Sequence, residues 1–416
     1  MKKTAGFVCL KGLLVLILFL FLFLFSVPIK AQWNQAGLDG YYIRTITVSG
    51  SNVYVGTSGD GMFRSTNNGL SWLAANSGLV GLEFPAFAIS GTNLYAGSEG
   101  EGVFLSVNNG ASWSALAPLT NQFVFALAVS GTDLYAGVDG GGVFRSTNNG
   151  ASWTNSTSGM TNTRVSSLLI SGTNLFAGTF GGAGVYLSTN NGTSWIAAGN
   201  GLTNTEVQTL NITPSLPGYI FAGTANGAFY TTNNGASWNA INNGLTDTYV
   251  HTFAFSGTTI FAGTDMEGVF RSTNLGASWT AMNQGLTNTT VWVLTAAGSN
   301  LYAGTNGSGV FKRALSEMVA VQQVSSEIPG RFSLSQNYPN PFNPVTTIKF
   351  GIVKSGIVQI RIYDAAGRIV DELVNNGYNP GSYEVKWDAS KYSSGIYFYS
   401  IVNNELTQTK KMVLVK

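Results

Sequence analysis

Seven segments of the sequence share one framework and differ at two positions, where the side chains range from aromatic to charged. The framework is a Gly-Leu-Thr-Asn-Thr motif, variously edited, followed by an apolar run. The first variable position is occupied by Tyr42, Glu83, Phe123, Arg164, Glu206, Tyr249 and Thr290. Two residues later the second is occupied by Arg44, Pro85, Phe125, Ser166, Gln208, His251 and Trp292. Packing alone would tend to repeat one residue type, so such a mixture suits a sugar or a peptide.

Nine of these residues form our candidate ligand-binding set. They are Tyr42, Arg44, Glu83, Phe123, Arg164, Glu206, Tyr249, His251 and Trp292. Free variation at exposed loop tips is the alternative interpretation, and the sequence leaves it open. We interpret His251 on its own as a residue at a strand end and not as a catalytic base.

A second ionisable set lies on Gly-rich loops and consists of Asp60, Glu99, Glu101, Asp139, Asp265 and Glu267. Paired carboxylates can hydrolyse glycosidic bonds, and calcium prefers such oxygens. These residues are spread over four repeats, and their spacing places no pair at a catalytic separation. We therefore predict solvated loops that maintain solubility, with no metal site, no cofactor and no assigned catalytic residue.

The elements that position these residues repeat with a period near 41. Successive tryptophans lie 41, 40, 42, 43 and 41 residues apart, at Trp72, Trp113, Trp153, Trp195, Trp238 and Trp279. Each unit reads as four short strands separated by turns, and a period of about 40–45 residues with four strands is typical of a β-propeller. The second-strand motif appears seven times but the tryptophan turn only six. A segment around Trp33 resembles a fourth strand without its own blade, so we predict seven blades closed by an N-terminal strand.

The turn before each tryptophan, Ser65-Thr-Asn-Asn-Gly-Leu-Ser-Trp72 in the first copy, resembles the Asp-box (sialidase-type, BNR) repeat. Asparagine replaces the aspartate of that pattern at Asn67, Asn108, Asn148, Asn190, Asn233 and Asn274. The resemblance implies a structural turn, and asparagine can bond back to turn amides and tolerates a positive φ. The sialidase activity that the resemblance suggests requires converging arginines. Arg64, Arg145 and Arg271 occupy equivalent positions that rotational symmetry spreads apart, and Arg44 and Arg164 lack a third partner.

Both ends of the chain carry targeting features. An apolar run from Leu13 to Phe25 follows Met1-Lys-Lys3, which predicts a signal peptide over residues 1–31, with an uncleaved anchor as the alternative. The single cysteine, Cys9, would leave with it. Residues 32–313 form the predicted propeller; seven basic and eleven acidic residues give it a net charge of −4, which argues against nucleic acid as a partner. We expect a monomer.

Residues 314–330 read as a linker and residues 331–416 as a small β-sandwich with alternating strands. This module contains Asn337-Tyr-Pro-Asn-Pro-Phe-Asn-Pro344, Ser394-Gly-Ile-Tyr397 and a terminal Lys410-Lys-Met-Val-Leu-Val-Lys416. These motifs resemble the type A sorting domain of the type IX secretion system. The resemblance implies that the secretion machinery recognises residues 331–416 and exports the protein to the cell surface or the exterior.

The sequence therefore predicts an all-β, exported chain whose propeller is a binding module for a glycan or a protein, in preference to an enzyme, and leaves the question of an enzymatic activity open. Two alternatives stay open. One is an extracellular carbohydrate-active hydrolase that uses carboxylates among Glu83, Glu206 and the acidic loops. The other is a scaffold or assembly-factor propeller that holds other proteins together.

Overall fold

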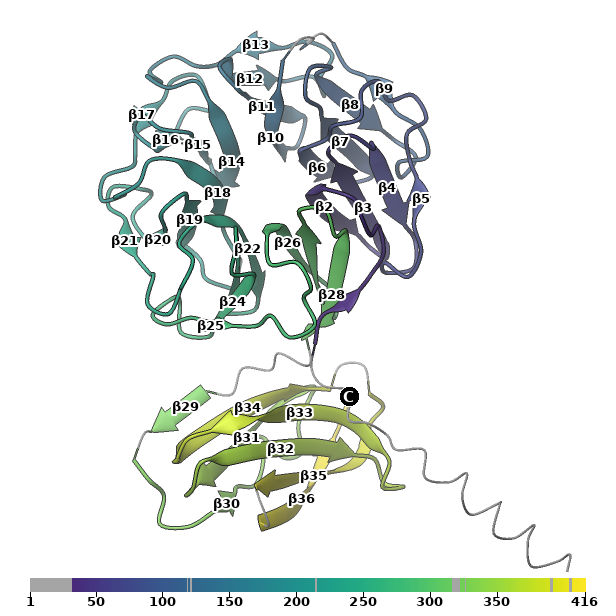
Figure 1. The fold of residues 1–416 in the computed structure, drawn as a ribbon, viewed down its shortest axis with the longest axis vertical. Coiled ribbons are helices and arrows are strands. Elements are labelled where there is room, and N and C mark those ends of the chain that lie inside the picture. Colours follow the sequence, from purple (N-terminus) through teal and green to yellow (C-terminus); the bar gives the residue numbers. More distant parts are fainter. Residues whose placement is uncertain are drawn as a thin grey trace, which may run out of the picture.

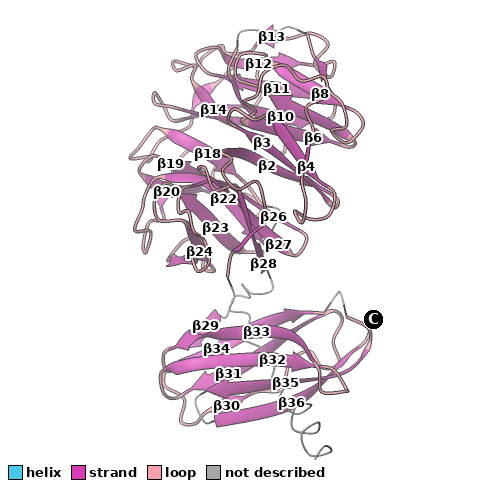
Figure 2. Cartoon of the chain, turned by 45° about the vertical axis from the view of Figure 1, so that its right-hand side comes forward, coloured by secondary structure: helices cyan, strands magenta, loops and turns pink. Residues whose placement is uncertain are grey.

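The computed structural model describes residues 32–416 except 118, 120–121, 214, 316–321, 326, 390–391 and 404–405. The predicted signal peptide lies outside these residues. The described chain is all-β, with seven four-stranded sheets arranged as the blades of a ring and two further sheets in a second body (Figure 1; Figure 2). The described residues include no helix long and apolar enough to cross a membrane.

Each blade is an antiparallel meander whose strands run from the centre of the ring outward. The innermost strands are β2 (Ile43–Ser49), β6 (Ala86–Ser90), β10 (Val124–Ser130), β14 (Val165–Ser171), β18 (Val207–Asn211), β22 (Val250–Ser256) and β26 (Val291–Ala297). The second strands are β3 (Asn52–Thr57), β7 (Asn93–Gly97), β11 (Asp133–Val138), β15 (Asn174–Thr179), β19 (Ile220–Thr224), β23 (Thr259–Thr264) and β27 (Asn300–Thr305).

The third strands are β4 (Met62–Ser65), β8 (Val103–Ser106), β12 (Gly142–Ser146), β16 (Val185–Ser188), β20 (Gly227–Thr231), β24 (Val269–Ser272) and β28 (Val310–Ala314). The outermost strands have two residues each: β5 (Leu73–Ala74), β9 (Ser114–Ala115), β13 (Thr154–Asn155), β17 (Ile196–Ala197), β21 (Asn239–Ala240), β25 (Thr280–Ala281) and, in the seventh blade, β1 (Asn34–Gln35).

The second strands form the densest part of the ring because neighbouring blades cover both of their faces. Their Leu-Tyr-Ala-Gly sequences are buried almost throughout. The glycine is required by close approach: a Cβ on Gly178 would lie 2.7 Å from Cγ1 of Val207 on the next blade. Small residues on one blade and branched residues on the next therefore fix the spacing between the sheets.

The N-terminal strand closes the ring as the sequence predicts. β1 pairs antiparallel with β28 through Asn34 and Lys312, and the seventh sheet has the order β1-β28-β27-β26. Trp33 is 1% exposed, and its indole N–H donates to the carbonyl of Met282 on the preceding blade at 2.6 Å. Five of the six repeat tryptophans make the same bond to the blade before their own. Trp153 is the exception, since its buried indole nitrogen has no hydrogen-bond partner among the described residues.

The asparagine turns join the third strand of a blade to the fourth. In blade three, Oδ1 of Asn148 accepts from the amide of Ser152 at 2.9 Å and from the hydroxyl of Ser146 at 2.8 Å. The same bonds recur at Asn67, Asn108, Asn190, Asn233 and Asn274. The positive φ falls one residue later than the sequence suggests, on the second asparagine of five turns and on Leu275 (φ 60°) in the sixth. The first asparagine thus bonds the turn, and its neighbour takes the left-handed conformation.

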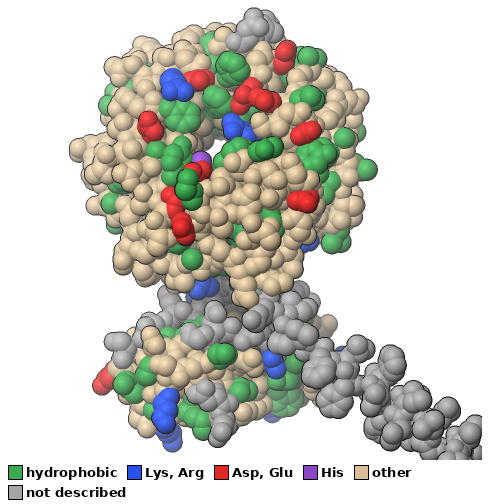
Figure 3. Space-filling model, in the orientation of Figure 1, with side chains coloured by type: hydrophobic (Ala, Val, Ile, Leu, Met, Phe, Trp, Pro, Cys, Tyr) green, Lys and Arg blue, Asp and Glu red, His purple; other side chains and the backbone are tan. Residues whose placement is uncertain are grey.

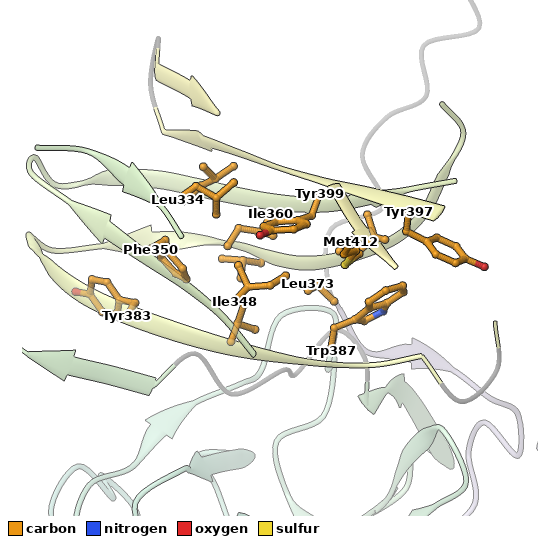
Figure 4. Packing of buried hydrophobic residues seen from close by; sticks show 14 of the residues in the cluster. Leu334, Ile348, Phe350, Ile360, Leu373, Tyr383, Trp387, Tyr397, Tyr399 and Met412 are labelled. Atoms are coloured by element: carbon orange, nitrogen blue, oxygen red, sulfur yellow. The ribbon is translucent and has the colours of Figure 1, made fainter. Parts of the chain in front are cut away.

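The C-terminal body consists of two four-stranded sheets packed face to face. One has the order β29-β34-β31-β30 and the other β33-β32-β35-β36. Their bounds are β29 (Gln322–Ser325), β30 (Ser333–Leu334), β31 (Val345–Ile352), β32 (Gly356–Tyr363), β33 (Ile369–Tyr378), β34 (Gly381–Asp388), β35 (Gly395–Asn403) and β36 (Leu406–Leu414). Inward-facing residues of both sheets, including Ile348, Ile360, Trp387 and Tyr399, form one core (Figure 4).

Three strands of this body, β29, the two-residue β30 and β33, are not among the five strands expected from the sequence. β33 covers Ile369–Tyr378, a stretch whose Asp-Glu and Asn-Asn pairs interrupt the apolar alternation. β29 lies inside the predicted linker and pairs with β34. The backbone ladders of β32 and β34 hold these segments, which their own composition would not place in a sheet.

Candidate binding site at the propeller mouth

One end of the ring carries two kinds of loop in every blade, and we call this end the mouth face. It comprises the loops that lead into the innermost strands and the loops between the second and third strands. A single backbone hydrogen bond joins the two kinds of loop in each blade. In blade two, the amide of Glu99 donates to the carbonyl of Glu83 at 3.1 Å, and the equivalent bonds in the other blades measure 3.0–3.2 Å. The first variable position is the acceptor in all seven.

The second variable position lies on a β-bulge. In six blades the register between the first and second strands shifts at this residue, as at Arg44 between the pairs made by Ile43 and Thr45. Blade two is the exception, with Pro85 directly before β6. A bulged residue is left out of the ladder, so its side chain can be aimed independently of the strand. The bulge therefore explains how residues as different as Arg44, His251 and Trp292 occupy one position.

A third ring of variable residues was missed by the sequence analysis. These residues donate the repeated backbone bond and are Ser58, Glu99, Asp139, Phe180, Ala225, Asp265 and Asn306. Only the acidic ones were singled out from the sequence, yet each lies two residues after the glycine of its second strand. A buried hydroxyl fixes this loop in six blades, as where Oγ1 of Thr57 donates to the carbonyl of Gly61 at 2.8 Å. Residues from the loop before the innermost strand, from the bulge in that strand and from the loop after the second strand therefore all lie on the mouth face.

Blades seven, one and two contribute one continuous cluster. The rings of Tyr42 and Trp292 have centroids 6.4 Å apart, and the guanidinium of Arg44 lies over the Trp292 ring at 5.2 Å. Arg44 also contacts Oε1 of Glu99 at 3.4 Å. Burial is the main cause that raises the pKa of Glu99, to about 7; hydrogen bonding with Glu83 raises it further and Arg44 opposes the shift. The Glu99 carboxyl is therefore partly protonated near neutral pH.

Blade six places His251 between a carboxylate and an aromatic ring. Nε2 of His251 lies 3.0 Å from Oδ1 of Asp265, and the Tyr249 ring centroid lies 4.6 Å from that of the imidazole. Burial lowers the pKa of His251 and outweighs the opposing effect of Asp265. The imidazole is consequently neutral at physiological pH, and it acts as a hydrogen-bonding group at the mouth.

Blades three and four form a third pair. Nε of Arg164 donates to Oδ1 of Asp139 at 2.8 Å, and its guanidinium lies 5.4 Å from the Phe180 ring centroid. Arg44 and Arg164 thus stand on blades one and four, each paired with its own carboxylate. They form no converging cluster, in agreement with the sequence argument against sialidase chemistry.

Two candidate residues lie outside these three groups and are open to solvent. Phe123 is 47% exposed and Glu206 is exposed. Of the acidic loop set, three members are exposed as expected (Asp60, Glu101 and Glu267), whereas the other three pair with Arg44, Arg164 and His251. The prediction of purely solvated acidic loops is therefore wrong for half of the set. The described residues contain no group of three or more His, Cys, Asp or Glu that could hold a metal ion.

Comparison with known families identifies the C-terminal body first. Residues 336–416 match the family described as the secretion system C-terminal sorting domain. The chain is therefore exported by the type IX secretion system, to the cell surface or the extracellular space, and carries a β-propeller ahead of the sorting domain. No curated protein sequence matches the chain significantly.

Solved structures similar to the chain are propellers of several kinds. The GH74 enzyme of Niastella koreensis shares 19% identity with a TM-score of 0.54, over 66% of this chain and 43% of the enzyme, so this chain spans less than half of that protein. YCF48 from Cyanidioschyzon merolae shares 14% identity with a TM-score of 0.54, over 68% of this chain and 98% of its own. YCF48 bound to D1 peptide shares 13% with a TM-score of 0.53, over 68% and 94%. At these identities the likeness shows the fold alone.

Proposed function

We propose that the propeller is a binding module, displayed or released outside the cell, whose mouth recognises a glycan or a protein. The observation that supports this proposal is the aromatic and charged arc that runs across blades six, seven, one and two. On blade six Tyr249 contacts His251, and Trp292 on blade seven contacts Tyr42 and Arg44 on blade one.

The local structure is suited to recognition because the arc combines apolar ring faces with fixed polar groups. Aromatic faces contact sugar rings or apolar side chains, while Arg44 and His251 supply directional hydrogen bonds. The bulges and the hydroxyl-pinned loops hold these side chains on a rigid ring, which lowers the entropic cost of binding. A protein ligand has a parallel in the peptide bound by the similarly folded YCF48.

The test uses the purified protein on glycan and protein arrays, followed by a variant in which Tyr249, His251 and Trp292 are all changed to alanine. We expect the affinity for any ligand found to fall at least about tenfold, which corresponds to about 1.4 kcal/mol. Asp133→Asn, on the turn at the opposite end of the ring, is the matched control and leaves affinity unchanged. Retained affinity in the triple variant contradicts the proposal.

One feature favours a second candidate function, an extracellular carbohydrate-active hydrolase. The pKa of Glu99 is raised to about 7, and the residue lies beside Glu83 in the mouth; a raised pKa is what a general acid needs. Against it, the Glu99 carboxylate already pairs with Arg44 at 3.4 Å, and this charge favours the ionised form over the protonated form that a general acid needs. Incubation with a panel of polysaccharides across pH, with Glu99→Gln and Glu83→Gln as controls, tests this function. Absence of any released sugar removes it.

A further inference from the structure

Three times around the mouth, a cationic or basic side chain lies between an aromatic ring and a carboxylate. Arg44 has Trp292 and Glu99, and Arg164 has Phe180 and Asp139. His251 has Tyr249 and Asp265. An aromatic face and a carboxylate are together the groups that hold a guanidinium, through cation–π attraction and charged hydrogen bonds. The mouth is thus built from cation-holding pairs, three of which are occupied by the chain's own residues.

The charge of the mouth face exceeds what these residues neutralise. Of the eleven acidic residues in 32–313, ten lie on mouth-face loops and only Asp133 lies at the opposite end. The ten are Asp39, Asp60, Glu83, Glu99, Glu101, Asp139, Glu206, Asp247, Asp265 and Glu267. Two arginines, Arg44 and Arg164, oppose them. Acidic side chains surround the central opening in the space-filling view (Figure 3), and such a face attracts cations.

Between blades two and three, the Phe123 ring and the Glu83 carboxylate flank Glu99, and of these three residues only Glu99 has a basic partner, Arg44. The Phe123 side chain is 47% exposed. Its backbone forms a β-bridge with Glu99, and its carbonyl accepts a hydrogen bond from the amide of Asp139. Glu83 adjoins Glu99 through the backbone hydrogen bond between them, and its carboxylate accepts a hydrogen bond from the hydroxyl of Ser58 at 3.5 Å. Neither Phe123 nor Glu83 is in contact with Arg, Lys or His within the described chain.

We propose that this place binds an arginine side chain of a basic peptide, with the guanidinium against the Phe123 ring and paired with Glu83, next to the Glu99–Arg44 pair. The inference rests on the proposed binding function and names its ligand. Both fully charged internal examples, Arg44 and Arg164, are guanidinium groups, which are planar and stack on aromatic faces. A peptide is therefore favoured over an amino sugar, whose ammonium group does not stack in this way.

Proton exchange at Glu99 gives the site a second signature. The charged groups that act on this carboxyl are Glu83, Asp139 and Arg44. A bound guanidinium stabilises the ionised carboxylate and so lowers its pKa from about 7. Binding therefore releases protons near neutral pH, and affinity rises as pH increases through about 7.

The experiment titrates the purified full chain with an acetylated tetra-arginine amide, and with the matched tetra-citrulline peptide, which has the same shape and no charge. Calorimetry in two buffers of different ionisation enthalpy measures the proton release. We expect tetra-arginine to bind at low ionic strength and tetra-citrulline not to bind. Phe123→Ala and Glu83→Gln each weaken binding by about tenfold. Glu267→Gln, an equal charge change on blade six, alters it by less than about twofold.

Equal binding of the two peptides overturns the inference, as does an equal loss from Glu83→Gln and Glu267→Gln. Tight binding of a glucosamine oligomer that depends on Phe123 overturns the choice of a peptide. Thermal melting of each variant confirms folding, and Phe123 is exposed enough to be changed without loss of the core. A different outcome is that tetra-arginine does not bind while the arrays identify a neutral ligand whose binding is lost in the triple alanine variant. In that case the inference is wrong and the proposed function stands.

Discussion

Replacing Trp33 by alanine should open the ring at its closing strand. The side chain is 1% exposed, packs against Met282 and Leu286, and donates its indole N–H to the Met282 carbonyl at 2.6 Å. Removing so large a buried side chain costs about 3–5 kcal/mol. The backbone bonds of β1, at about 0.5–1.5 kcal/mol each, do not offset the ordering of residues 32–38 at about 1–2 kcal/mol per residue. We therefore expect the segment to detach while the other blades stay folded.

Trp279→Ala is the matched control, because Trp279 is 5% exposed and makes the same 2.6 Å bond to the carbonyl of Ile241. Its strand is tied covalently to the third strand by the Asn274 turn, whereas β1 is tied to β28 by pairing alone. Hydrogen exchange should accelerate at Val310 and Lys312 in Trp33→Ala and stay slow at the corresponding β24 amides in Trp279→Ala. Equal protection of β28 in the two variants would refute this account of ring closure.

Three further outcomes follow from the turns, the seams and the mouth. Asn148→Ala should lower the free energy of unfolding by about 1–2 kcal/mol, because the amide of Ser152 loses its acceptor; Asn148→Asp, which keeps the acceptor, should stay within about 0.5 kcal/mol in the same denaturant titration. Trp153→Phe should cost less than Trp195→Phe by about 1 kcal/mol, since only Trp195 has a bonded indole N–H, and equal losses of thermal stability would contradict this. Glu99 holds its proton more tightly folded than unfolded, so its contribution to stability is present below about pH 4.5 and is lost as pH rises through about 7. The melting temperature of the wild type, measured relative to that of Glu99→Gln, should decrease as pH rises from about 4.5 to about 7. A difference that does not change with pH would show that the pKa of this carboxyl is not raised.

The ring and its closure can be predicted from the sequence because each blade corresponds to one copy of an internal repeat. Six tryptophan turns and seven second-strand motifs leave one fourth strand unaccounted for, and the Trp33 segment is the only unmatched copy. Strand β33 was not predictable in the same way. Its polar pairs contradict the strand alternation, and only the ladder with β32 holds it in the sheet.

The candidate site was predictable as a set of positions but not as a set of contacts. Comparing the repeats against one another finds Tyr42, Arg44, His251 and Trp292 without coordinates. It does not show that the second position is a bulge, because a bulge changes register without changing the spacing along one strand. It also missed Phe180, a loop residue that joins the mouth through its backbone bond to Arg164 and through its ring contact with the Arg164 guanidinium. Whether these positions bind a ligand stays a prediction.

Ring closure by β1 has a consequence for how the protein is made and sorted. The strand leaves the ribosome among the first, yet Trp33 meets a partner 249 residues later in the chain. The strand cannot pair until β28 has been synthesised, because the loop that this pairing closes spans almost the whole propeller. A chain cut short before residue 310 lacks β28, the partner of β1, and also lacks the sorting domain at 336–416. Because the sorting domain follows β28 in the sequence, every chain that carries the export signal also contains the strand that pairs with β1.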